Sequence, residues 1–185
     1  MLQTIIIPDT VKSDNQNGLN WIKTELKKRN IKVTDVGFPE EYSFNEWEKA
    51  LAPFTKDIGI STIFIAIGGG VPFILKQIEL RPITSMGIFL IGGFTGKTGT
   101  KEYDNNLIED INFQEIKKKV MRFFIYNSQD DPLVPIDNGQ QLAKNLDTDL
   151  FELEDSGHFN KDQSHEDFEE ILIDILSIEN QFEDE

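Results

Sequence analysis

The strongest constraint on the fold is a run of six residues, 62–67, that is apolar after its first threonine and ends in three consecutive glycines, 68–70. Such a run predicts a strand that is buried on both faces, as in a parallel sheet. Apolar residues then recur at helical spacing from Val71 to Ile78, which predicts a helix that begins within the glycines. A sharp turn from strand to helix is where α/β proteins expose reactive or anion-binding groups.

The rest of the chain alternates short apolar strands with amphipathic helices. Strands are predicted at 4–7, 32–38, 62–67, 86–91, 122–126 and 149–153, with helices between them and a last helix before the acidic residues 179–185. This alternation predicts an α/β fold, a three-layer sandwich around a mostly parallel six-stranded sheet. The third strand is expected at the centre, and the second at the edge beside the first. We expect one domain, residues 1–178, and an acidic C-terminal tail, 179–185.

Composition excludes several classes of partner. The 185 residues carry a formal net charge of −15, so nucleic acid and anionic membrane surfaces are unfavourable partners. The chain has no cysteine and no apolar run of the length that a membrane span needs, which fits a cytoplasmic protein. The sequence indicates no cofactor and no metal site.

Three loops are predicted at the carboxyl edge of the sheet, where such folds bind ligands. They are the glycine turn, residues 127–135 and residues 155–159. In chain order they supply a strand–helix elbow, then Asp131, then His158, which is the order of the α/β-hydrolase triad. Hydrolases carry a serine at the centre of G-x-S-x-G at the elbow. Here the five positions read Ala-Ile-Gly-Gly-Gly from residue 66, so the nucleophilic hydroxyl is missing.

The sequence resembles the compact serine hydrolases related to retinoblastoma-binding protein nine, which are α/β-hydrolases without a large cap. The resemblance covers nearly the whole chain and rests on these segments: Asn20-Trp21-Ile22-Lys23, Glu25-Leu26, Phe94-Thr95, Asp130-Asp131-Pro132 with Pro135, and Ser156-Gly157-His158-Phe159. It implies that Asp131 is the triad acid, that His158 is the base and that Gly68 stands at the nucleophile position. It also implies oxyanion or ligand-binding positions at Asp9 and Gly69. The loop Pro8-Asp9-Thr10 departs from the family's glycine-rich pattern.

Each of these features has a simpler interpretation. The three glycines can serve close packing of strand and helix, or their amides can form an anion-binding nest. His158 can bond Asp131 for stability alone. The hydroxyls of Ser128 and Thr95 are the nearest by topology to the elbow, but neither lies on it. The segment Gly96-Lys97-Thr98 is similar to the end of a phosphate-binding loop, but Ile91 stands where that motif needs its first glycine.

Three functions follow from these patterns. The first is a serine-hydrolase-family protein that has lost covalent catalysis at Gly68 and acts by binding a small ligand or a protein partner. The second is a carboxylester hydrolase that uses Asp131 and His158 with a non-standard nucleophile or with water. The third, more remote, is nucleotide binding through residues 96–98. An open elbow favours a small ligand, whereas an elbow filled by side chains favours a structural or partner-binding role.

Overall fold

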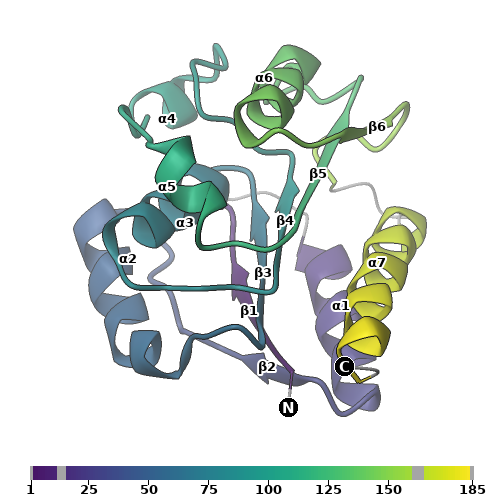
Figure 1. Cartoon of the computed structure of the whole chain (residues 1–185). Coiled ribbons are helices and arrows are strands. Elements are labelled where there is room, and N and C mark those ends of the chain that lie inside the picture. Colours follow the sequence, from purple (N-terminus) through teal and green to yellow (C-terminus); the bar gives the residue numbers. More distant parts are fainter. Residues whose placement is uncertain (1, 12–15, 160–164, 184–185) are drawn as a thin grey trace.

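The structure is a computed structural model, and it describes residues 2–11, 16–159 and 165–183. Its centre is a six-stranded sheet in the order β2-β1-β3-β4-β5-β6, in which every pair of neighbours is parallel (Figure 1). The predicted α/β class, the parallel sheet, the inner place of the third strand and the edge place of the second are all confirmed. The strands are β1 (Gln3–Ile7), β2 (Lys32–Thr34), β3 (Thr62–Ile67), β4 (Gly87–Ile91), β5 (Phe123–Ser128) and β6 (Leu150–Leu153).

Helices cover both faces of the sheet and complete the three layers (Figure 1). Four helices pack against one face: α2 (Phe44–Leu51), α3 (Gly70–Leu80), α5 (Phe113–Lys117) and α6 (Ile136–Leu146). Two helices, α1 (Gln16–Lys28) and α7 (His165–Glu183), lie side by side on the other. None of the helices within the described residues is both long enough and apolar enough to cross a membrane.

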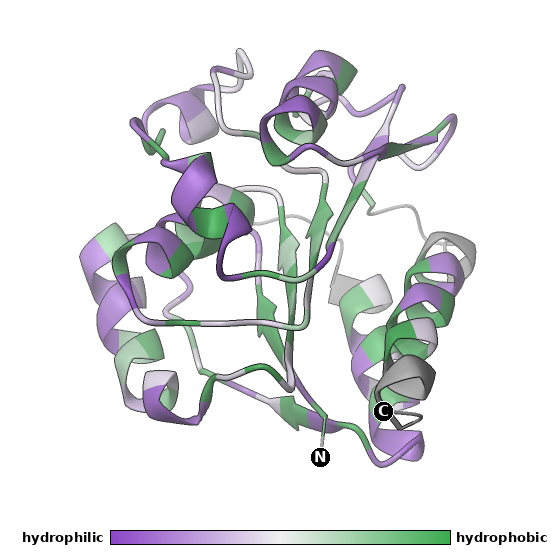
Figure 2. Cartoon of the chain, viewed as in Figure 1, coloured by the Kyte–Doolittle hydropathy of each residue, from purple (hydrophilic) through white to green (hydrophobic). Residues whose placement is uncertain are grey.

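The sheet supplies side chains to two separate cores, because successive residues of a strand point to opposite faces. In β3, Phe64 and Ala66 face the layer of α2 and α3, whereas Ile65 and Ile67 face α1 and α7. All six residues of this strand are buried, as expected for an inner strand of a doubly covered sheet. Figure 2 shows the matching pattern on the ribbon, with hydrophobic strands inside and hydrophilic stretches on the outer sides of the helices.

Three elements differ from the sequence prediction in extent. The second strand stops at Thr34, before Gly37, whose φ of +67° breaks the extended conformation. The helix predicted between the second and third strands ends at Leu51 and continues as a 3-10 helix, η1 (Ala52–Asp57), because Pro53 has no N–H to donate to the preceding turn. The last helix reaches Glu183, so it includes most of the segment 179–185 that was assigned to a tail.

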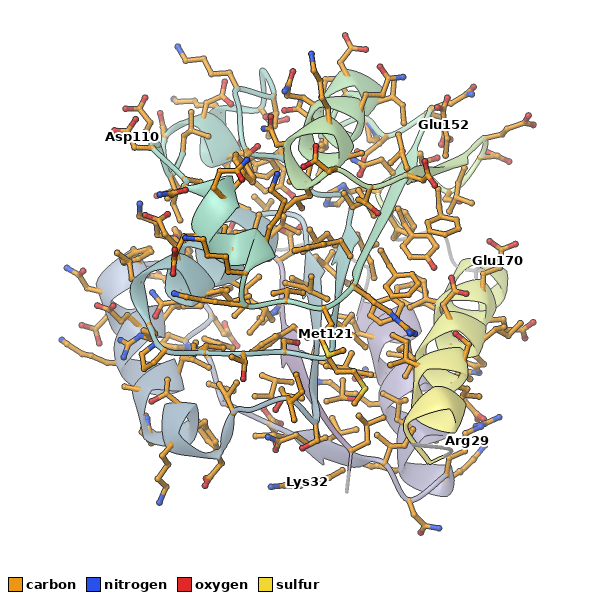
Figure 3. All side chains as sticks on the ribbon, viewed as in Figure 1. Arg29, Lys32, Asp110, Met121, Glu152 and Glu170 are labelled. Carbon is orange, nitrogen blue, oxygen red and sulfur yellow. The ribbon has the colours of Figure 1, made fainter. Side chains whose placement is uncertain are left out.

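The carboxyl ends of the strands meet at one edge of the sheet. Figure 3 labels Glu152, in β6, near this edge, and Lys32, the first residue of β2, near the opposite edge. A short helix, α4 (Lys101–Asp104), also lies at the carboxyl edge, in the segment between β4 and β5 (Figure 1). The loops at this edge hold the residues that the sequence predicts for the site.

Candidate functional site

Four loops bring the predicted site residues together. Asp9 follows β1, Gly68 and Gly69 follow β3, Asp131 follows β5, and His158 follows β6. Hydrogen bonds link Asp9 to Gly69, Asp9 to His158, and His158 to Asp131. All of the positions selected from the sequence therefore lie in one cluster, although their roles remain predictions.

Gly68 forms the tip of the turn between β3 and α3. Its φ is +50°, in the left-handed region that glycine adopts without steric cost. A Cβ atom added at Gly68 would overlap the carboxyl group of Asp9, with Oδ2 only 2.6 Å away. A Cβ atom at Gly69 would overlap the side chain of Thr10, whose Cβ would be 2.8 Å away. The absence of side chains at these two positions is what allows the loop after β1 to pack directly onto the elbow.

The carboxylate of Asp9 fills the space in front of this turn. Oδ1 accepts hydrogen bonds from the backbone N–H of Gly69, at 2.9 Å, and of Val11, at 3.3 Å. Oδ2 lies 3.0 Å from Nε2 of His158 and accepts a hydrogen bond of 2.8 Å from the hydroxyl of Tyr103. The side chain of Asp9 is only 3% exposed. The sequence placed Asp9 among oxyanion or ligand-binding positions; in the structure its side chain is an acceptor, and the two backbone donors come from Gly69 and Val11.

The pair formed by Asp131 and His158 has the geometry of a catalytic acid and base. Nδ1 of His158 lies 2.7 Å from Oδ2 of Asp131, and both side chains are fully buried. Oδ1 of Asp131 accepts hydrogen bonds from the backbone N–H groups of Leu133 and Val134, at 2.8 and 3.0 Å. These bonds fix the carboxylate, which in turn orients the imidazole so that Nε2 faces the elbow.

Tyr103 is a member of the cluster that the sequence analysis missed. Its hydroxyl lies 2.9 Å from Nε2 of His158 as well as 2.8 Å from Asp9, and the residue is 1% exposed. Burial raises the pKa of Tyr103, and the nearby charges of Asp9 and Asp131 raise it further, so the hydroxyl stays a neutral donor. It comes from α4, a helix of four residues whose sequence has no apolar periodicity to reveal it.

His158 lies between two carboxylates, and this sets its protonation state. Burial alone would lower its pKa, but the hydrogen bonds and charges of Asp131 and Asp9 outweigh burial and raise the pKa to about 9. Both ring nitrogens face carboxylate oxygens, so an imidazolium that donates from both nitrogens satisfies both contacts. The raised pKa favours the imidazolium at neutral pH, a form in which Nε2 carries a proton and offers no lone pair to a general-base step.

Ser128, one of the two hydroxyl residues considered as a substitute nucleophile, does not face the elbow. Its hydroxyl donates to Asp130 at 2.6 Å and accepts from the backbone N–H of Ser156 at 3.0 Å. Asp130 also accepts from the N–H of Gly157. These bonds join the loop after β5 to the loop after β6, so Ser128 helps to position His158 and is fully buried itself.

The Gly-Lys-Thr segment is bound to an acidic side chain. Asp104 accepts hydrogen bonds from the N–H groups of Thr98 and Gly99, at 2.8 and 3.2 Å. These amides are the donors that a phosphate would need, and a carboxylate beside them repels a phosphate. Within the described residues, moreover, no group of three or more His, Asp and Glu side chains is arranged to hold a metal ion.

The fold and the cluster together define an α/β-hydrolase, and comparison with known proteins places the chain within that class. The family described as "Serine hydrolase" matches residues 4–176, and the chain belongs to this family. YdeN of Bacillus subtilis (strain 168) is 23% identical over 180 residues, which cover 95% of this chain and 94% of YdeN.

Solved structures agree on the fold. The crystal structure of the ydeN gene product from B. subtilis superposes with a TM-score of 0.87 at 22% identity, covering 97% of this chain and 100% of that chain. Alpha/beta hydrolase domain-containing protein 10 from mouse has a TM-score of 0.67 at 14% identity, covering 97% and 90% of the two chains. Esterase PE8 has a TM-score of 0.63 at 13% identity, covering 96% and 92%.

Proposed function

We propose that this member of the serine hydrolase family has lost serine-based covalent catalysis and acts by noncovalent binding of a protein partner. In this proposal Gly68 stands where the family places its nucleophilic serine. The observation that carries the proposal is that the Asp9 carboxylate occupies the space that a side chain at residue 68 would need. An elbow that has no hydroxyl, and in which the Asp9 carboxyl group takes the space of a side chain at residue 68, supports partner binding over turnover of a small substrate.

The state of His158 supports the same proposal. A serine hydrolase needs a neutral imidazole to take the proton of its nucleophile. Here the carboxylates on both sides raise the pKa of His158 to about 9, which favours the protonated imidazole at neutral pH. In this proposal the site therefore lacks both the nucleophilic hydroxyl and a free general base.

Labelling with a fluorophosphonate probe tests this proposal directly, because the probe phosphonylates an activated hydroxyl. We expect no stoichiometric labelling of the unmodified protein and no hydrolysis of short activated esters above that of a His158→Gln variant. The variant is the matched control, since ester cleavage by surface groups is the same in both proteins. Stoichiometric labelling at Ser128, Thr95 or any other hydroxyl, or ester turnover that His158→Gln abolishes, would overturn the proposal.

A second candidate function rests on the placement of the Asp9 carboxylate. One of its oxygens faces the His158 imidazolium and the other accepts from backbone amides. In a hydrolytic reaction Oδ2 would attack an ester carbonyl and the leaving alkoxide would take the Nε2 proton of His158. Water would then cleave the resulting acyl–Asp9 anhydride, with the now neutral His158 as base.

Isotope incorporation distinguishes this second candidate from the first. Turnover of an ester in water enriched in ¹⁸O would place ¹⁸O in the Asp9 carboxylate, because water that attacks the anhydride at the aspartyl carbon leaves its oxygen there. Mass spectrometry of the Asp9 peptide would show the added mass, and Asp9→Asn would be inactive. Label in Asp9 would support the second candidate. Ester turnover that Asp9→Asn retains would exclude it, because water that attacks the acyl carbon leaves Asp9 unlabelled, and absence of turnover would favour the first candidate.

A further inference from the structure

The contacts of Asp9 match what an anion-binding site provides for a bound carboxylate. The site offers four donors: the N–H of Gly69, the N–H of Val11, the hydroxyl of Tyr103 and Nε2 of His158. The first two converge on Oδ1 and the last two on Oδ2. Donors on both oxygens, one of them cationic, are the pattern that binds a carboxylate strongly.

The same four donors also match the final stage of ester hydrolysis. The acid product of that reaction is a carboxylate beside the elbow, with one oxygen at the backbone amide after the nucleophile position and the other at the imidazole. Asp9 places Oδ1 at the N–H of Gly69, the residue after Gly68, and Oδ2 at His158. The Asp9 carboxylate therefore makes the contacts expected of an acid product that is still bound in the active site of a hydrolase.

We propose that the elbow is a binding site for a small carboxylate anion and that the protein fills this site with its own Asp9 side chain. The proposal goes beyond the function proposed above and rests on it in one respect, which is that residue 68 carries no nucleophile that competes for the space. The Asp9 side chain is a ligand supplied by the chain itself. Removing it leaves the four donors in place and creates a vacancy for an external anion of the same chemistry.

Chemical rescue tests this inference. Asp9→Ala removes the carboxyl group and leaves His158, Tyr103 and the two amides unchanged. Loss of one partner of a buried ion pair is strongly destabilising, so we expect the Tm to fall by roughly 10 °C. Sodium formate should restore at least half of that fall in a saturable way, with a Kd of about 1 mM or weaker, which is the limit for an anion of three heavy atoms. Formamide and sodium chloride at the same ionic strength should not.

Asp104→Ala is the matched control. Asp104 also accepts hydrogen bonds from two loop amides and from the hydroxyl of Thr98, but its donors within the described residues include no imidazole. We expect Asp104→Ala to lower the Tm and formate to leave it unchanged. Asp9→Gly should accept both formate and acetate, because it also frees the volume of the Cβ atom, whereas Asp9→Ala should prefer formate.

Two results would overturn the inference. One is a folded Asp9→Ala variant that formate does not stabilise, or that formate stabilises no more than it stabilises Asp104→Ala. The other is an Asp9→Asn variant with the Tm of the unmodified protein, since the amide keeps the shape but not the charge. If Asp9→Ala does not fold alone, recovery of folded protein only when formate is present during refolding supports the site, and equal recovery without formate overturns it. None of these outcomes depends on probe labelling, so failure here is distinct from failure of the proposed function.

Discussion

The two carboxylates that flank His158 differ in where their supporting contacts come from. Asp131 is held by the N–H groups of Leu133 and Val134, two and three residues further along its own loop. Asp9 has one local donor, the N–H of Val11, but it also accepts from the N–H of Gly69, 60 residues away, and from the hydroxyl of Tyr103, 94 residues away. The first side of the imidazole is thus built by one local turn, whereas the second also needs segments that only the fold brings together.

The two sides also differ in what they do to the imidazole. Asp131 alone would orient His158 and leave Nε2 available to the elbow, as in an active triad. The Asp9 carboxylate contacts Nε2 of His158 through Oδ2 and the elbow N–H of Gly69 through Oδ1. The Asp131 side therefore makes the contacts expected of an orienting carboxylate, whereas on the other side the Asp9 carboxylate contacts both Nε2 and the elbow.

The largest effect that we expect concerns restoration of a nucleophile. Gly68→Ser alone should not be labelled by a fluorophosphonate, because its Cβ would overlap the Asp9 carboxyl group, and strain should cost about 1–3 kcal/mol of stability. The double variant Asp9→Gly with Gly68→Ser removes the obstruction and one of the two charges that keep His158 protonated. We expect the probe to label this double variant stoichiometrically on the hydroxyl that the substitution introduces at position 68, as measured by mass spectrometry.

The control for this experiment is Asp9→Gly combined with Gly68→Ala, which has the same Cβ atom and no hydroxyl. It should fold as well as the double variant with serine and remain unlabelled. If the single variant Gly68→Ser were labelled as fully as the double variant, the comparison would be contradicted. That result would mean that the Asp9 side chain does not obstruct the elbow.

The second prediction uses pH to compare the two sides. The pKa of His158 is raised in the folded protein from 6.5 to about 9, so its imidazolium stabilises the fold fully below pH 6.5. This stabilisation is lost as pH rises from about 6.5 through about 9 and amounts to about 3 kcal/mol at most. Urea unfolding at pH 6 and pH 9.5 measures it, with His158→Gln as the reference for all other titrating groups.

Removing either charge should weaken this pH dependence. Asp131→Asn should weaken it more than Asp9→Asn, because the contact of Asp131 with the ring is 2.7 Å and that of Asp9 is 3.0 Å. A pH dependence in Asp9→Asn as steep as in the unmodified protein would show that Asp9 does not hold the proton on Nε2.

Whether a site residue could be identified from the sequence depends on whether its contacts are local or join distant segments of the chain. Asp131 and His158 were identifiable because a turn sequence and a short motif carry them, and the elbow because glycines follow a buried strand. The glycines have both of the meanings considered for them: they allow close packing, and one of their amides binds an anionic group. The contact of Asp9 with Gly69 has no local signal, because it depends on β1 and β3 being neighbours and on how the loop after β1 packs. Tyr103 was missed for the same reason.

The smallest effects should come from the hydroxyl that supports each side. Tyr103→Phe removes a buried donor to the Asp9 carboxylate, and a hydrogen bond to a charged group contributes about 1.5–3 kcal/mol. Ser128→Ala is the counterpart on the Asp131 side, because its hydroxyl accepts from Ser156 and donates to Asp130 without touching the ring or Asp131. We expect a loss of about 2 kcal/mol for Tyr103→Phe and about 1 kcal/mol for Ser128→Ala by urea unfolding at pH 7. The order follows from burial, since the Tyr103 hydroxyl serves a carboxylate that is 3% exposed and its removal leaves that charge with one donor fewer. If Ser128→Ala cost more than Tyr103→Phe, the Asp9 side would depend on its backbone amides and His158 alone, and Tyr103 would be a packing residue that happens to lie beside it.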